Sequence, residues 1–166
     1  MRSNLPAALA AVFLTIAGCQ SDTPGGNSPH LAGQRIDQVA VSAPFQAVLE
    51  ANNTPQAVRV LVQFYDSTQA LPVSASGVLE LRMHDGRIPP ESISSISPDS
   101  VWTFTSSELK SMYRHVGYGL WGYPLILQLE HWQPKRGVIT VQARYLPTGG
   151  GEIFSSPIHI VLGGEG

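Results

Sequence analysis

The stretch that decides the fold is AVRVLVQFY at residues 57–65, where Val58, Val60, Val62 and Phe64 occupy every second position. Successive side chains of a β-strand point to opposite faces, so this spacing predicts a strand with one face turned into a core. The β-branched valines favour the extended backbone that such a strand needs. We therefore expect the core of the protein to form around residues 57–65.

Short apolar or alternating runs recur on both sides of this stretch. The expected strands are, in chain order, residues 37–41, 45–49, 58–65, 77–83, 101–104, 125–132, 139–145 and 153–162. The sequence PKRG at residues 134–137 is typical of a turn, which predicts that the strands before and after it form a hairpin. Three glycines at residues 149–151 mark another turn before the closing strand.

One segment has a helical pattern. Thr105 and Glu108 have the spacing of a capping box, Leu109 and the residues up to Tyr113 complete one or two turns, and glycines at positions 117 and 119 are expected to end the helix. Elsewhere proline and glycine, 13 and 16 residues in the chain, punctuate the gaps between strands. Many short strands without alternating long helices predict an all-β fold, an antiparallel immunoglobulin-like β-sandwich of about seven to eight strands with one short helix.

Residues 57–85 are similar to immunoglobulin-like or transthyretin-like sandwich modules of bacterial surface proteins. The likeness rests on V-x-V-x-V-x-F-Y-D at residues 58–66, on a proline-containing link at residues 72–73, and on GVLEL at residues 77–81. It implies two facing strands that are joined over a loop. It assigns no functional residue.

The first 18 residues differ in kind from the rest. Arg2 supplies a positive start, an uncharged apolar run extends from Ala7 to Ile16, and Ala17 and Gly18 are small. This order is typical of a secretory signal. Residues 5–18 are also too few for a transmembrane helix, which needs about 20 apolar residues.

The tetrapeptide Ile16-Ala17-Gly18-Cys19 resembles the lipobox of bacterial lipoproteins, with isoleucine where leucine is usual. The resemblance implies that Cys19 carries diacylglycerol, that the signal is cleaved before it, and that the new amino group is acylated, for example with palmitate. Two or three acyl chains anchor a protein stably in a membrane. Gln20, in place of aspartate, favours the outer membrane in a cell with two membranes.

These observations divide the chain into three parts: a signal peptide at residues 1–18, a flexible tether at 19–35, and a β-sandwich domain at 36–163. Residues 20–34 are rich in Ser, Gly and Pro and have no apolar period, which is typical of a linker. The net charge is −2, and losing Arg2 with the signal makes it −3. Without clustered Lys and Arg we expect no nucleic-acid partner.

The sequence contains no recognisable catalytic motif. Cys19 is the only cysteine, so we expect the mature domain to hold no disulfide, cysteine nucleophile or zinc–cysteine site. G-x-S-x-G, H-E-x-x-H and phosphate-loop motifs are absent. We expect no enzyme activity, no cofactor and no metal, and we interpret Glu108 and Glu130 as solvated surface charges.

The five histidines are expected to be surface, turn or linker residues. Three of them, His84, His131 and His159, lie on or beside different strands, so a metal site could in principle gather them, but their spacing does not indicate one. His115 follows the expected helix, and His30 lies in the tether. Trp102 and Trp132 each end an alternating run and are expected in the core or at the sandwich edge.

The most unusual segment is YRHVGYGLWGY at residues 113–123. Flexible glycines beside flat amphipathic rings are typical of sugar-stacking or partner-binding loops. The possible binding residues are Tyr113, Tyr118, Trp121 and Tyr123. The other interpretation is a loop that plugs the end of the sandwich, with Trp121 as its buried stopper.

The leading hypothesis is a lipid-anchored module of the cell envelope that binds or scaffolds without catalysis. Its partners would be the membrane, through acyl chains on Cys19, and an envelope protein or a glycan. The alternative is a carbohydrate-binding module that uses residues 113–123. An enzyme whose residues converge only in three dimensions ranks third.

Overall fold

The computed structural model describes residues 35–44, 48–51, 54–117 and 119–162. The expected signal peptide, the expected acylation site Cys19, His30 and Tyr118 lie outside the described residues, as does the expected tether apart from Arg35. In the described part of the chain, no helix has both the length and the apolar character needed to cross a membrane.

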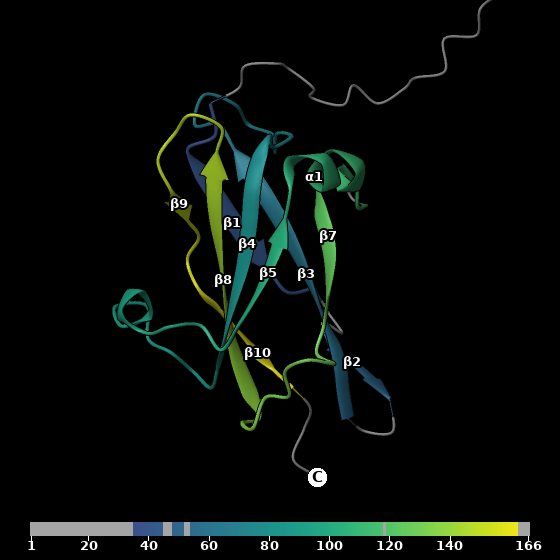
Figure 1. Cartoon of the computed structure of the whole chain (residues 1–166). Helices are drawn as coiled ribbons and strands as arrows, with labels where there is room; N and C mark the ends of the chain where they lie inside the picture. Colours follow the sequence, from purple (N-terminus) through teal and green to yellow (C-terminus); the bar gives the residue numbers. More distant parts are fainter. Residues whose placement is uncertain (1–34, 45–47, 52–53, 118, 163–166) are drawn as a thin grey trace, which may run out of the picture.

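The longest strand, β3 (Thr54–Tyr65), is the centre of the first antiparallel sheet (Figure 1). Two shorter strands, β1 (Gln38–Ser42) and β2 (Val48–Ala51), pair with its two halves along one edge. Along the other edge β3 pairs with β7 (Trp121–Gln128), and β6 (Arg114–His115) pairs with the start of β7. The strand predicted from the valine alternation therefore organises this sheet.

The second sheet is built on β4 (Gly77–Asp85) and β8 (Val138–Pro147), which are paired over nine residues. Along the free side of β4 lies β5 (Ser100–Phe104). Along the free side of β8 lie β9 (Ile153–Phe154) and β10 (Ile158–Val161). The single closing strand expected at residues 153–162 is thus interrupted, and between its two parts the Ser155 hydroxyl accepts the Ala143 N–H at 2.9 Å.

The two sheets form an antiparallel sandwich, which confirms the predicted fold class. The described residues contain eight strands of at least four residues and two of two residues. When β1 with β2 and β9 with β10 are each counted as one interrupted edge strand, the strands occupy the positions A-B-E-D and G-F-C-C′ of an immunoglobulin sandwich. The strands β3 and β4 lie in opposite sheets, joined over residues 66–76.

The predicted hairpin between the strands on either side of residues 134–137 is wrong. The chain does turn there, and the Asp85 carboxylate accepts the backbone N–H groups of Lys135 and Arg136. However, β7 pairs with β3 and β8 pairs with β4, so the connection crosses from one sheet to the other. A turn sequence indicates that the chain reverses direction but does not select the neighbouring strand.

The core between the sheets consists of alternate residues of the long strands. Val58, Val60, Val62 and Phe64 are fully buried, as their spacing predicts. The neighbouring strand β7 contributes Tyr123, Leu125 and Leu127, and the facing sheet contributes Leu79, Leu81, Met83, Ile139, Val141, Ala143 and Tyr145. Trp102 and Trp132 are partly buried against this core, edge to face with ring centroids 6.4 Å apart, as expected for the sandwich edge.

The expected helix is present as α1 (Ser106–Met112), and its capping box is confirmed. The Thr105 hydroxyl accepts the Glu108 N–H, and the Glu108 carboxylate accepts the Thr105 N–H at 2.7 Å. Leu109 is fully buried and anchors the helix to the sandwich. The helix ends at Met112, before the glycines that were expected to end it, because Tyr113 turns to an extended backbone and its ring is buried.

The connection between β4 and β5 covers part of the outer face of the second sheet. It contains a short 3₁₀ turn, η1 (Ile93–Ser95), and projects to one side of the sandwich (Figure 1). The Ile88 N–H in this connection donates to the outward-facing hydroxyl of Thr140 at 2.9 Å. The neighbouring His84 is only 1% exposed, so the expectation that it is a surface or turn residue is wrong.

Candidate functional site

Strands β6 and β7 form a β-hairpin. β6 pairs with the start of β7, and across the turn the Val116 N–H donates to the Leu120 carbonyl at 2.9 Å. Gly117 and Gly119 have φ values of 100° and 76°, a backbone region that residues with side chains rarely adopt. The glycines therefore close a turn, and the aromatic side chains are held on strands.

The aromatic rings on and around this hairpin pack in a column that runs into the core. The consecutive ring pairs are His115–Trp121 at 5.7 Å, Trp121–Tyr113 at 5.4 Å, Tyr113–Tyr123 at 5.2 Å and Tyr123–Phe64 at 5.3 Å between centroids. Edge-to-face and offset contacts of this kind stabilise beyond the area they bury. The column joins the hairpin to β3 as one packed unit.

Three tyrosine hydroxyls, two of them on this column, form hydrogen bonds to the β3–β4 connection. The Tyr113 hydroxyl donates to the Pro72 carbonyl at 2.8 Å, and the Tyr123 hydroxyl accepts the Ala75 N–H at 2.6 Å. The Tyr145 hydroxyl donates to the carbonyl of residue 76 at 2.8 Å. Burial raises the pKa of Tyr113 to about 12, and it also raises the pKa values of the other two tyrosines.

These contacts place three of the four predicted binding residues. Tyr113 and Tyr123 are 8% and 0% exposed, so their rings build the framework and cannot contact a ligand directly. Trp121 is half-buried between the Tyr113 ring and His115. Tyr118 lies outside the described residues. The plug interpretation thus describes Tyr113 and Tyr123, with Tyr123 rather than Trp121 as the deepest ring.

A groove runs along β7 beside this aromatic column. One part, of about 520 Å³, lies on the outer face of the first sheet and is lined by Arg59, Arg114, His115, Val116, Pro124 and Ile126. A second part, of about 290 Å³, lies next to α1 and is lined by Phe104, Ser111, Met112, Arg114, Pro124, Leu125 and Ile126. The two parts share Arg114, Pro124 and Ile126, so we treat them as one surface, the β7 groove.

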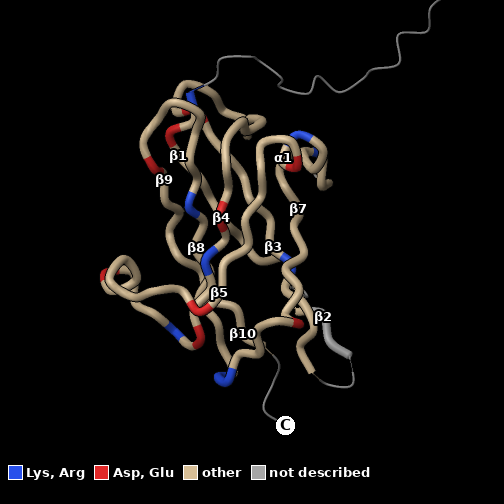
Figure 2. Tube along the Cα trace, in the orientation of Figure 1, with Lys and Arg blue, Asp and Glu red and all other residues tan. Residues whose placement is uncertain are grey.

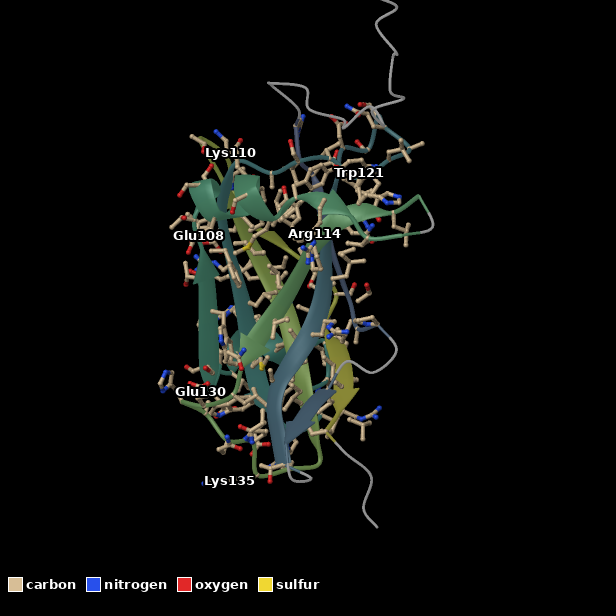
Figure 3. The ribbon with its side chains drawn as sticks, turned by 90° about the vertical axis from the view of Figure 1, so that its right-hand side faces the viewer. Glu108, Lys110, Arg114, Trp121, Glu130 and Lys135 are labelled. Carbon is tan, nitrogen blue, oxygen red and sulfur yellow. The ribbon has the colours of Figure 1, made fainter. Side chains whose placement is uncertain are left out.

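The β7 groove is basic and apolar. In the described part of the chain its lining includes two arginines and no aspartate or glutamate, and Ile126 is 50% exposed. Among the described residues the ion pairs join Arg144 to Glu80 and Glu152 on the other sheet, and neither Arg59 nor Arg114 takes part in one. Figure 2 shows both charge signs scattered over the fold, and in Figure 3 Arg114 lies just below α1 on the side facing the viewer.

The backbone of β7 is open along the same groove. In an antiparallel pair, alternate residues direct their N–H and C=O groups to opposite edges. Leu129 donates its N–H to Gln56 next to β3, and the Trp121 carbonyl accepts from the Gln63 side chain of β3. Odd-numbered residues therefore face β3, whereas the even-numbered residues 124, 126 and 128 face the edge where β6 has already ended.

Neither the arginines nor the open edge was predicted as a site from the sequence. A feature of the sequence could have pointed to Arg59, since it is the only charged residue in the alternating pattern of β3. Ile126 is a second signal, because it is apolar on the face of β7 that carries Gln128. Arg59 and Arg114 are far apart in the chain, so no local pattern indicates that they line one groove.

The described residues contain no group of three or more His, Cys, Asp or Glu side chains arranged to hold a metal ion. His84 and His159 both lie beside Thr140 in the sheet register. The Thr140 hydroxyl donates its single hydrogen to the Gly86 carbonyl at 2.7 Å, so the His159 Nδ1 3.0 Å away acts as the donor. The buried Nδ1 of His84 has no hydrogen-bond partner among the residues that the structure describes, and burial lowers the pKa of that imidazole.

Comparison of the chain with models of known protein families, with curated proteins and with solved structures gives no match.

Proposed function

We propose that the protein is a lipid-anchored lipoprotein of the cell envelope whose sandwich domain binds a partner and does not catalyse a reaction. The observation that carries the proposal is the β7 groove, in which arginines with no ion-pair partner among the described residues border apolar side chains along an open strand edge. Charge, apolar contact and free backbone groups are the elements from which recognition surfaces are made. The anchoring rests on the resemblance of residues 16–19 to a lipobox.

In this proposal, acyl chains on Cys19 hold the domain at a membrane, the outer one if the cell has two. The described chain begins at Arg35, and β1 starts opposite Tyr65, at the end of β3 nearest the β6–β7 hairpin. Residues 19–35 span at most about 60 Å when fully extended. The partner would therefore be bound close to the membrane surface.

The alternative, carbohydrate binding through residues 113–123, has less support. Sugar stacking requires exposed ring faces, and Tyr113 and Tyr123 are buried. Of the described Tyr and Trp rings in that segment, only that of Trp121 is partly exposed, and one of its neighbours is already the stacked Tyr113 ring. The β7 groove offers more contact to a partner than that single indole does.

Acylation can be tested with the full chain expressed in a bacterium with two membranes. Mass spectrometry should find an acylated Cys19 as the first residue of the mature protein, and Cys19→Ala should remain unprocessed and unacylated. Gln20→Asp is the matched control, because it keeps the cysteine and should alter only the membrane in which the acylated protein is found. Normal membrane attachment of Cys19→Ala would contradict the anchoring.

Binding can be tested by chemical crosslinking in intact envelopes, followed by purification through a C-terminal tag. We expect a discrete crosslinked partner that is lost when Arg59 and Arg114 are both changed to glutamate. Arg87→Glu, an exposed arginine outside the groove, is the control. The absence of any protein partner, together with retention on purified peptidoglycan, would favour the carbohydrate alternative.

A further inference from the structure

We infer that the β7 groove binds an extended, acidic segment of a partner protein, which adds to the first sheet as a new strand beside β7. The inference rests on the proposed binding function and names the chemistry of its ligand. Three features carry it: the direction of the free backbone groups, the charge of the lining, and the apolar residue between them.

The backbone of β7 defines where the new strand would pair. The chain's own β6 ends at the pairs Arg114–Gly122 and His115–Trp121. Beyond them Pro124 has no N–H to donate, whereas Ile126 and Gln128 direct both an N–H and a C=O towards the open edge. An added strand would therefore take up the place that β6 leaves and make its main-chain bonds to residues 126 and 128.

The side chains around this edge define the charge of the ligand. Arg59 lies opposite Ile126 in the sheet register, and Arg114 borders both parts of the groove. No described acidic side chain lines the groove or pairs with either arginine. Carboxylates of a bound strand would accept charge-assisted bonds from these guanidinium groups, while an apolar side chain would cover the half-exposed Ile126.

The same features disfavour other occupants. In a symmetric pair of two copies joined along β7, the Arg59 and Arg114 side chains of both copies would meet, and like charges would repel. A glycan would need exposed ring faces, and among the described residues no Trp, Tyr or Phe lines the larger part of the groove. An acidic peptide satisfies the backbone edge and the arginines together.

The test begins with a phage library that displays random twelve-residue peptides, selected on the full chain in mild detergent. We expect enriched peptides with two or more Asp or Glu residues alternating with apolar or β-branched ones. A synthetic peptide of the enriched sequence should slow hydrogen exchange at the Ile126 and Gln128 amides. Selection of sequences no more acidic than the library, or binding to anionic phosphatidylglycerol vesicles instead, would overturn the inference.

Two pairs of variants separate charge from backbone pairing. The double variant Arg59→Glu, Arg114→Glu should bind the selected peptide with an affinity lower by about tenfold or more. From the same library this double variant should select peptides that contain Lys and Arg. Gln128→Pro removes one outward N–H and should also weaken binding, whereas Gln128→Ala keeps that N–H and should bind normally. Thermal melting confirms that each variant is folded.

Equal binding by Gln128→Pro and Gln128→Ala would exclude strand addition. This failure is distinguishable from failure of the proposed function. If a crosslinked envelope partner persists in all the groove variants, the proposed binding function stands, but the β7 groove is not the binding site. If the wild-type protein is not acylated and has no crosslinked partner, the proposed function itself is contradicted.

Discussion

The hydroxyl of Tyr123 is expected to be a major local contributor to the stability of the sandwich. It accepts the N–H of Ala75 at 2.6 Å, and Ala75 is 3% exposed. Tyr123→Phe keeps the ring and its contact with Phe64 but leaves that N–H buried without an acceptor. The perturbation is therefore confined to one hydrogen bond between β7 and the β3–β4 connection.

The expected cost follows from the burial of the abandoned donor. A buried N–H that loses its only acceptor destabilises a protein by about 1–3 kcal/mol, more than the net value of an average hydrogen bond. For a domain of this size, a loss of about 2 kcal/mol lowers Tm by roughly 8 °C. Tyr145→Phe is the matched control, because its hydroxyl donates to the carbonyl of the exposed Ser76, where water can replace it. We expect that control to cost less than about 1 kcal/mol.

Urea unfolding followed by circular dichroism at 25 °C measures both free energies of unfolding. The wild-type protein, Tyr123→Phe and Tyr145→Phe should share one m value, so that their midpoints report stability alone. If Tyr123→Phe were as stable as the wild type, or less affected than Tyr145→Phe, the argument from the buried Ala75 N–H would be refuted. Hydrogen exchange at the Ala75 amide, faster in Tyr123→Phe, supplies an independent readout.

Two further predictions concern pH. The pKa values of the buried tyrosines are raised in the folded state, to about 12 for Tyr113, whereas unfolded tyrosines ionise near pH 10. The free energy of unfolding should therefore be constant below pH 10 and decline as the pH rises through 12. Urea midpoints measure this decline, and an unchanged midpoint at pH 11.5 would contradict the prediction. The pKa of buried His84 is lowered, so the unfolded chain takes up that proton first and stability should fall as pH drops below about 6.5. His84→Leu should flatten that fall between pH 7 and 5.5, and equal falls in both proteins would assign it to other groups.

Much of the fold is readable from local sequence. The valine alternation at residues 57–65 predicts the central strand, because the alternation alone shows which side chains share the apolar face, whichever strand pairs with it. The capping box of α1 is equally local, since Thr105 and Glu108 bond across one turn of helix. The burial of Tyr123 is also readable locally, because it alternates in phase with the buried Leu125 and Leu127, although the neighbouring glycines suggest a loop.

The sequence by itself thus determined the approximate positions of the long strands, where the helix starts, and which face of each long strand enters the core. Tertiary structure alone decided that β7 joins β3 instead of β8, that Arg59 and Arg114 line one groove, and that His84 is covered. The physical reason is the range of the interactions. Alternation and capping act between residues a few positions apart, whereas strand pairing and groove formation depend on how both sheets close over a shared core.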